Sequence, residues 1–124
     1  MKYLILIHVA PAVEALFAAM DDDERGAAYQ LYWDIESDLE HTGELVDSKA
    51  VAADTQSTVT RADDGSAVVT PITGDITVSG YYLVDVTDEA RAAAIAARFP
   101  EAAVEGGIRL ARVWTQADFD AMTS

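Results

Sequence analysis

The chain of 124 residues contains no cysteine. That absence excludes a disulfide framework, a thiolate nucleophile and a zinc site built on cysteine. Long apolar runs are also missing: no segment approaches the roughly 20 apolar residues of a transmembrane helix, and the apolar run after Lys2 is too short for a secretory signal peptide. We therefore expect a cytoplasmic protein that has no membrane partner.

Positive charge is scarce. Eight lysines and arginines stand against 22 aspartates and glutamates, which gives a formal net charge of −14. Such a surface repels the phosphates of nucleic acids, so we expect no nucleic-acid partner. Two origins of the acidity stay open: a GC-rich genome or adaptation to high salt. The 51% hydrophobic content is ample for the core of one domain, which we place over residues 1–124.

The opening stretch "MKYLILIHVAP" predicts a strand over residues 3–9 that is apolar on both faces. Alternation places Leu4, Leu6 and His8 on one face and the intervening residues on the other. A strand buried on both faces lies in the interior of its sheet. Since so short a chain has few helices, we expect them to cover one face and a second copy of the chain to cover the other, in a homodimer.

Local signals define the other elements. Asp21 and Glu24 have the spacing of a capping box, and Gly43 is a typical residue after a helix end, so a helix is predicted over residues 22–42. The turn sequence "ADDG" between "STVTR" and "SAVVTP" predicts a hairpin. The remaining expected elements are a helix over 12–20, a strand in "ELVDSKAVA", a strand over 80–86, a helix capped by Thr87 and running to Phe99, a strand over 108–114, and a terminal helix capped by Thr115.

This order of elements is typical of one fold. Strand, helices, strand, inserted hairpin, strand, helix and strand together predict an α+β protein with the ferredoxin-like split βαβ arrangement and an antiparallel sheet. No repeat or linker interrupts the pattern.

Three stretches resemble the YCII-related (DGPF-domain) family: "MKYLILIHVAP", "SGYYLVDV" with the acidic, alanine-rich helix after it, and "IRLARVW". The resemblance implies a small dimeric α/β protein. It also implies that His8 matches the family histidine proposed to form an acid–base dyad with an aspartate, and it brings the precedent of a dehydrochlorinase. The family's Asp-Gly-Pro-Phe motif is absent here. If Pro71 matches its proline, Val69 or Thr70 stands where the aspartate belongs.

The predicted topology places the end of the first strand beside the beginnings of two others. His8 is therefore expected near Ser79 and Tyr81 on one side and near Arg109 on the other. Asp75, in the loop before "GYY", is the candidate replacement for the missing aspartate, since a carboxylate beside an imidazole supports general acid–base chemistry. Tyr81 (or Tyr82), Ser79 and Arg109 are the candidate substrate-binding residues.

Each of these residues also has a purely structural interpretation. His8 is equally read as a hydrogen-bonded residue of a strand end, Asp75 as a turn residue, and Arg109 as an ion-pair partner. The leading hypothesis is a cofactor-independent lyase or isomerase that acts on a small organic acid or phenol. The alternatives are a non-catalytic small-molecule-binding or protein-interaction module, or a purely structural assembly. His8 and His41 do not have metal-ligand spacing, so we expect no metal and no cofactor.

Overall fold

A computed structural model describes residues 1–123. In chain order, its elements are β1 (Lys2–Val9), α1 (Pro11–Ala18), α2 (Asp22–Thr42), β2 (Leu45–Ala50), β3 (Ser57–Arg61), β4 (Ala67–Pro71), β5 (Thr77–Asp85), α3 (Glu89–Ala96), the 3₁₀ turn η1 (Pro100–Ala103), β6 (Ile108–Arg112) and α4 (Gln116–Thr123). The chain is thus an α+β protein, as predicted.

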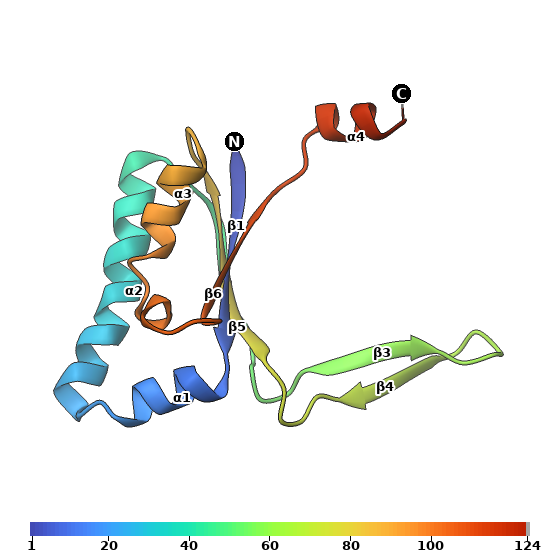
Figure 1. The fold of residues 1–124 in the computed structure, drawn as a ribbon, viewed down its shortest axis with the longest axis horizontal. Helices are drawn as coiled ribbons and strands as arrows, with labels where there is room; N and C mark the ends of the chain where they lie inside the picture. The colour runs from blue at the N-terminus through green and yellow to red at the C-terminus, as the bar shows by residue number, and fades with distance from the viewer. Residues whose placement is uncertain (124) are drawn as a thin grey trace.

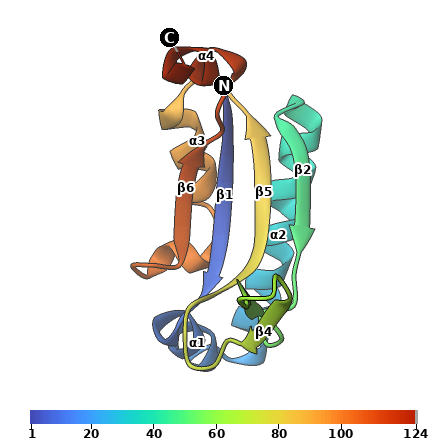
Figure 2. The ribbon, with the colours of Figure 1, turned by 90° about the vertical axis from the view of Figure 1, so that its right-hand side faces the viewer.

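The main sheet has four antiparallel strands in the order β2-β5-β1-β6 (Figure 2). The prediction that the first strand lies inside the sheet is confirmed. Helices α2 and α3 lie against one face of this sheet (Figure 1), and the core fills the space between them. The core residues are Tyr3, Ile5, Ile7, Ile35, Leu39, Tyr82, Val84, Val86, Ala92, Ile95, Ala96 and Phe99.

No helix of residues 1–123 covers the other face of the sheet (Figure 1). Since Ile5 and Tyr82 point into the core, alternation places Leu4 and Leu6 of β1 and Leu83 of β5 on this opposite face. These three leucines are only partly buried. We call this surface the open face.

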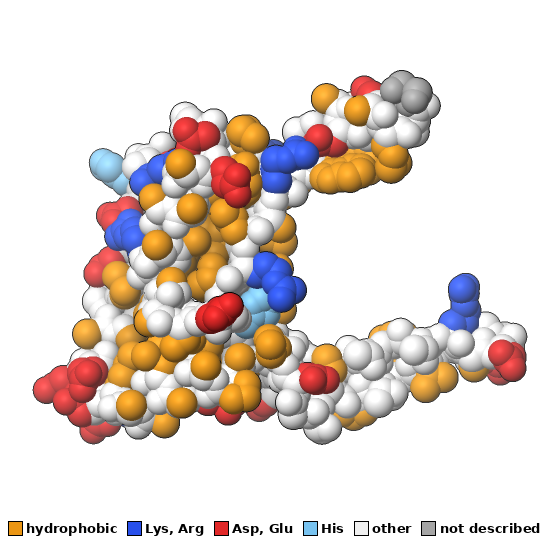
Figure 3. Space-filling view, viewed as in Figure 1, with side chains coloured by type: hydrophobic (Ala, Val, Ile, Leu, Met, Phe, Trp, Pro, Cys, Tyr) orange, Lys and Arg blue, Asp and Glu red, His pale blue; other side chains and the backbone are white. Residues whose placement is uncertain are grey.

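Two segments extend away from the main sheet on the side of the open face. One is the β3–β4 hairpin, in which every residue of both strands is exposed, and the other is α4 with the segment before it (Figure 1). Figure 3 shows that hydrophobic side chains gather on the side of the α4 segment that faces the gap between the two. An isolated two-stranded hairpin is marginally stable at best in water. The exposed strands of this hairpin therefore need a further surface to pack against.

The helix ends follow the local signals in α2 and differ from them at both ends of α3. Asp21 and Glu24 form the predicted capping box, and Gly43 takes the left-handed conformation (φ 78°) after α2. The next helix, α3, is capped by Asp88 and not by Thr87, because the Asp88 carboxylate accepts a hydrogen bond from the Arg91 amide at 2.8 Å. This helix also ends at Ala96 and does not reach Phe99.

Candidate functional site

His8 lies at the end of β1 and its side chain is buried, with 6% of its surface exposed. Its backbone amide donates to the carbonyl of Gly107 at 2.9 Å, which places it beside the start of β6 as predicted. The imidazole forms no hydrogen bond or ion pair with any other residue of 1–123, yet no enclosed side-chain nitrogen lacks a partner there. Both ring nitrogens therefore keep contact with solvent. Burial, aided by the charge of Arg109, lowers the pKa of His8.

A bulge changes the register that the sequence predicts around this histidine. Ile7 pairs with Gly80 but His8 pairs with Val78, so Ser79 is the extra residue of β5. The Ser79 hydroxyl donates to the Ile7 carbonyl at 3.3 Å. Simple alternation along β5 is therefore interrupted at Ser79, because two residues of β5 lie opposite one residue of β1.

Asp75 does not pair with His8. It is exposed, and it lines a shallow cavity of about 300 Å³ together with Val9, Glu14, Asp54 and other residues at the end of the sheet. No residue in 1–123 places a carboxylate in hydrogen-bond contact with the His8 ring. The acid–base dyad proposed from the sequence is thus not assembled, and the roles of His8 and Asp75 stay predictions.

Tyr81 and Arg109 lie on the open face, where both pair with Leu6 across the strands. The Tyr81 hydroxyl donates to Asp47 at 2.7 Å, and Lys49 binds the same carboxylate at 2.7 Å. Arg109 is exposed and makes no ion pair with a residue of 1–123. Of the four residues predicted around His8, Ser79 lies in the bulge opposite it and Arg109 acts on its ring through charge. Tyr81 is instead bound to Asp47, and Asp75 lies in an exposed loop.

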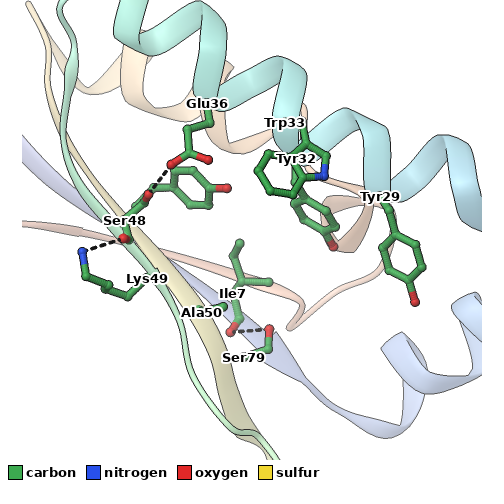
Figure 4. A pocket seen from close by; sticks show the side chains of 11 residues that line it. Ile7, Tyr29, Tyr32, Trp33, Glu36, Ser48, Lys49, Ala50 and Ser79 are labelled. Atoms are coloured by element: carbon green, nitrogen blue, oxygen red, sulfur yellow. Dashed lines mark hydrogen bonds between the residues drawn. The ribbon is translucent and has the colours of Figure 1, made fainter.

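A larger cavity lies elsewhere, between α2 and the sheet (Figure 4). Its volume is about 590 Å³, within the range of small-molecule sites. The helix contributes one wall, and β1, β2 and β5 contribute the other. The lining residues are Ile7, Tyr29, Tyr32, Trp33, Glu36, Ser48, Lys49, Ala50, Ser79, Gly80 and Tyr82. We call this space the helix–sheet cavity.

Small residues in the sheet and large ones on the helix make this cavity. A Cβ atom at Gly80 would lie 2.9 Å from the Lys49 carbonyl oxygen, so the close approach of β2 and β5 requires glycine at this position. Ala50 beside it adds little volume. Opposite them, Tyr29 and Trp33 project from consecutive turns of α2 (Figure 4) and are 53% and 68% exposed, which places them at the mouth.

The polar end of the cavity holds a carboxylate. Glu36 accepts a hydrogen bond from the Ser48 hydroxyl at 2.7 Å, and the Lys49 ammonium donates to the Ser48 carbonyl at 3.0 Å (Figure 4). The Tyr82 hydroxyl titrates abnormally here: burial, aided by the charges of Glu36 and Glu101, raises its pKa to about 12.

Behind the helical wall, a second carboxylate is fully enclosed. Glu101 of η1 is 3% exposed, and the Tyr32 hydroxyl donates to both of its oxygens, at 2.6 Å for Oε1. Burial raises the pKa of Glu101, although the hydrogen bond from Tyr32 opposes this shift. A Cβ atom at Gly107 would lie 2.2 Å from the Glu101 carbonyl oxygen, so a glycine is also needed for this packing.

Sequence reasoning missed the helix–sheet cavity. It gave no functional role to Tyr29, Tyr32, Trp33 or Glu36. The available signal was the spacing of 29, 32 or 33, and 36, which forms a stripe of aromatic and acidic residues beside the buried Ala28, Ile35 and Leu39 of α2.

Neither the described residues nor the comparisons with known proteins assign a function to this chain. Among residues 1–123, no group of three or more histidine, aspartate or glutamate side chains is placed to hold a metal ion. None of the helices in this part of the chain has the length and apolar character to cross a membrane. No family model and no curated protein matches the sequence.

Proposed function

We propose that this protein binds a small organic molecule in the helix–sheet cavity. The observation that carries the proposal is the cavity itself: about 590 Å³, bounded by four aromatic side chains and a few polar groups. Natural ligand sites combine these features, an apolar lining with a small number of polar atoms that orient the ligand. A non-catalytic small-molecule-binding module is one of the alternatives given by the sequence. The proposed site is the helix–sheet cavity and not the surroundings of His8.

A cavity-filling variant tests the proposal with Nile red, a neutral dye that fluoresces in apolar sites. Ala50→Phe places an aromatic ring in the cavity, whereas Ala94→Phe places the same ring on the exposed surface of α3 as a matched control. We expect wild type and Ala94→Phe to bind the dye saturably and Ala50→Phe to lose at least about tenfold in affinity, since the added ring occupies the binding space. Equal binding by all three would contradict the proposal.

A second candidate function is general acid–base catalysis by His8 in a cofactor-independent lyase or isomerase. It is supported by an imidazole with solvent-contacting nitrogens, no hydrogen-bond partner in 1–123 and a lowered pKa, since an uncommitted neutral ring can accept a proton. Diethyl pyrocarbonate tests this reactivity. Mass spectrometry should locate the modification at His8 at neutral pH, and the Arg109→Gln variant should keep it. Failure of His8 to react would contradict a catalytic role.

We further propose membership of the YCII-related family, a ferredoxin-like fold and a cytoplasmic location. The strand order β2-β5-β1-β6 supports the fold, and His8 at the end of β1 supports the family. The absent Asp-Gly-Pro-Phe motif agrees with a member that lacks the His–Asp dyad.

We also propose that a second copy of the chain covers the open face. A folded monomer of 13.3 kDa is expected to expose about 6,500 Å², whereas this chain exposes 8064 Å². The excess comes with an uncovered sheet face and with a hairpin whose strands are exposed at every residue. We choose a second copy as the occupant because, in a dimer with twofold symmetry, each protomer covers the same face of the other.

Light scattering during size-exclusion chromatography measures the assembly. We expect a mass of twice 13.3 kDa for wild type, and dissociation of the Leu83→Asp variant, because this change places a charge at the centre of the proposed interface. Ala94→Asp on the exposed surface of α3 is the control and should remain dimeric. A monomeric wild type at micromolar concentration would contradict the dimer.

A further inference from the structure

Three residues that line the helix–sheet cavity, Ser48, Ser79 and Tyr32, already donate their hydroxyl hydrogens to other groups of the protein. The hydroxyl of Ser48 donates to Glu36, that of Ser79 to the Ile7 carbonyl, and that of Tyr32 to Glu101. A hydroxyl carries one hydrogen and two acceptor lone pairs. The two serine oxygens therefore meet a ligand as acceptors. The side-chain hydrogens of the lining that form no hydrogen bond within residues 1–123 belong to Tyr29, Trp33, Tyr82 and the third N–H of Lys49.

The charge of the lining is negative. Its one cation, Lys49, pairs with Tyr81 of the open face, and its ammonium donates to Asp47 at 2.7 Å. Glu36 has no ion-pair partner among residues 1–123 and receives the Ser48 hydroxyl as its one side-chain donor. Its charge also acts across the cavity on the Tyr82 hydroxyl. The carboxylate of Glu36 thus has free lone pairs beside an apolar space. The Lys49 cation acts on it through its charge but forms no ion pair with it.

The aromatic walls suit the same kind of ligand. Tyr29 and Trp33 form the exposed mouth, and the ring of Tyr29 is held from behind by Phe17, whose ring lies 6.3 Å away in a stacked arrangement. Faces of tyrosine and tryptophan attract both aromatic rings and cations. A positively charged aromatic molecule would satisfy the walls and the polar end together.

We propose that the helix–sheet cavity selects an arylalkyl amine in its ammonium form, with the ammonium group bound by Glu36 and the ring between the mouth residues and the sheet. The inference rests on the proposed binding function and specifies its ligand class. It replaces the organic acid expected from the sequence, because a carboxylate ligand would face the like charge of Glu36.

Three probes of similar shape and different charge test the inference: phenethylamine, phenethyl alcohol and hydrocinnamate. The chain has two tryptophans, so a Trp114→Phe background leaves Trp33 at the cavity mouth as the single fluorescent reporter. We expect a saturable change in Trp33 emission, with phenethylamine bound at least about tenfold more tightly than hydrocinnamate, as one charge-assisted hydrogen bond provides.

Glu36→Gln should remove the preference for the amine, and Glu40→Gln, an equal change of charge on an exposed position of the same helix, should keep it. Equal affinity for all three probes, or tighter binding of hydrocinnamate, would overturn the ligand class and leave the binding function standing. No saturable change with any probe would also overturn the inference, while the Nile red experiment separately decides whether the cavity binds molecules at all.

Discussion

At the scale of single residues, His8 combines a buried ring with ring nitrogens that reach solvent. The sequence indicates its place at the end of an interior strand, and the structure confirms that place. It does not indicate the bulge or the absence of a carboxylate partner, because both depend on how the loop before β5 folds back. A histidine in such surroundings loses affinity for a proton, since the charged ring is poorly hydrated and lies near a guanidinium.

We predict that the His8 imidazole titrates below 6.5, the ordinary value. Burial is the main cause and Arg109 the second, so Arg109→Gln should raise the pKa towards 6.5 without reaching it. Nitrogen-detected NMR of the two histidines over a pH series measures both values. A His8 pKa at or above 6.5 in the wild type would show that a carboxylate reaches the ring, as in the dyad predicted from the sequence.

Glu101 is a residue-scale feature that no local pattern signals, because its partner Tyr32 is distant in sequence and meets it through packing. Its raised pKa means that the folded state binds a proton more tightly than the unfolded chain does. The wild type should therefore lose stability as the pH rises from 4.5 through the folded-state value.

We predict that Glu101→Gln is more stable than wild type at pH 8 by about 1 kcal/mol, because the amide still accepts from Tyr32 and carries no charge. The advantage should shrink as the pH falls towards 4.5. Urea unfolding at several pH values measures it. Tyr32→Phe is the complementary variant: it leaves the carboxylate without its donor and should cost about 1 to 3 kcal/mol. An advantage of Glu101→Gln that grows on acidification would contradict the account.

At the scale of elements, an ion pair fixes the start of β2 to the start of α3. Arg91 binds Glu44 through two nitrogens, at 2.9 Å and 2.7 Å. These hydrogen bonds lower the pKa of Glu44 from 4.5 to about 2. The stabilisation is thus complete above pH 4.5 and is lost as the pH falls towards 2.

We predict that Glu44→Gln lowers the free energy of unfolding by about 1 kcal/mol at pH 7, a modest value because solvent reaches the arginine and screens the pair. The difference from wild type should vanish near pH 2. Glu40→Gln, an exposed glutamate on α2, serves as the control and should change stability little. An unchanged difference between pH 7 and pH 2 would mean that the pair does not provide the stabilisation.

Helices and turns can be predicted from the sequence where the residues that define them lie close together in the chain. The capping box of Asp21 and Glu24 and the turn at Gly65 (φ 87°) act within a few residues, so both features are predictable. The helix–sheet cavity is different. It exists because Gly80 allows β2 to approach β5 while the aromatic residues of α2 lie above the gap, a relation between three elements that no single stretch encodes.

At the scale of the whole molecule, the net charge bears on how stability depends on salt, and the shape bears on the proposed dimer. The net charge of −14 on 124 residues produces self-repulsion that dissolved salt screens. Figure 3 shows a molecule with two projecting segments and a gap between them, which is the space that the proposed second copy would occupy.

If the acidity is an adaptation to high salt, the melting temperature should rise steeply between low and molar salt. Screening is not specific to one ion, so sodium chloride and potassium chloride should act alike. Calorimetry in both salts measures the change. A flat response would exclude the adaptation and leave genome composition as the explanation of the acidity.

The central claim is that the helix–sheet cavity, and not the end of the first strand, is the ligand site. Proton–nitrogen correlation NMR during titration with phenethyl alcohol, a neutral probe, tests it directly. The account predicts saturable shifts of the Gly80 and Lys49 amides and of the Trp33 indole N–H. Shifts centred on His8 and Arg109, or shifts that never saturate, would contradict it.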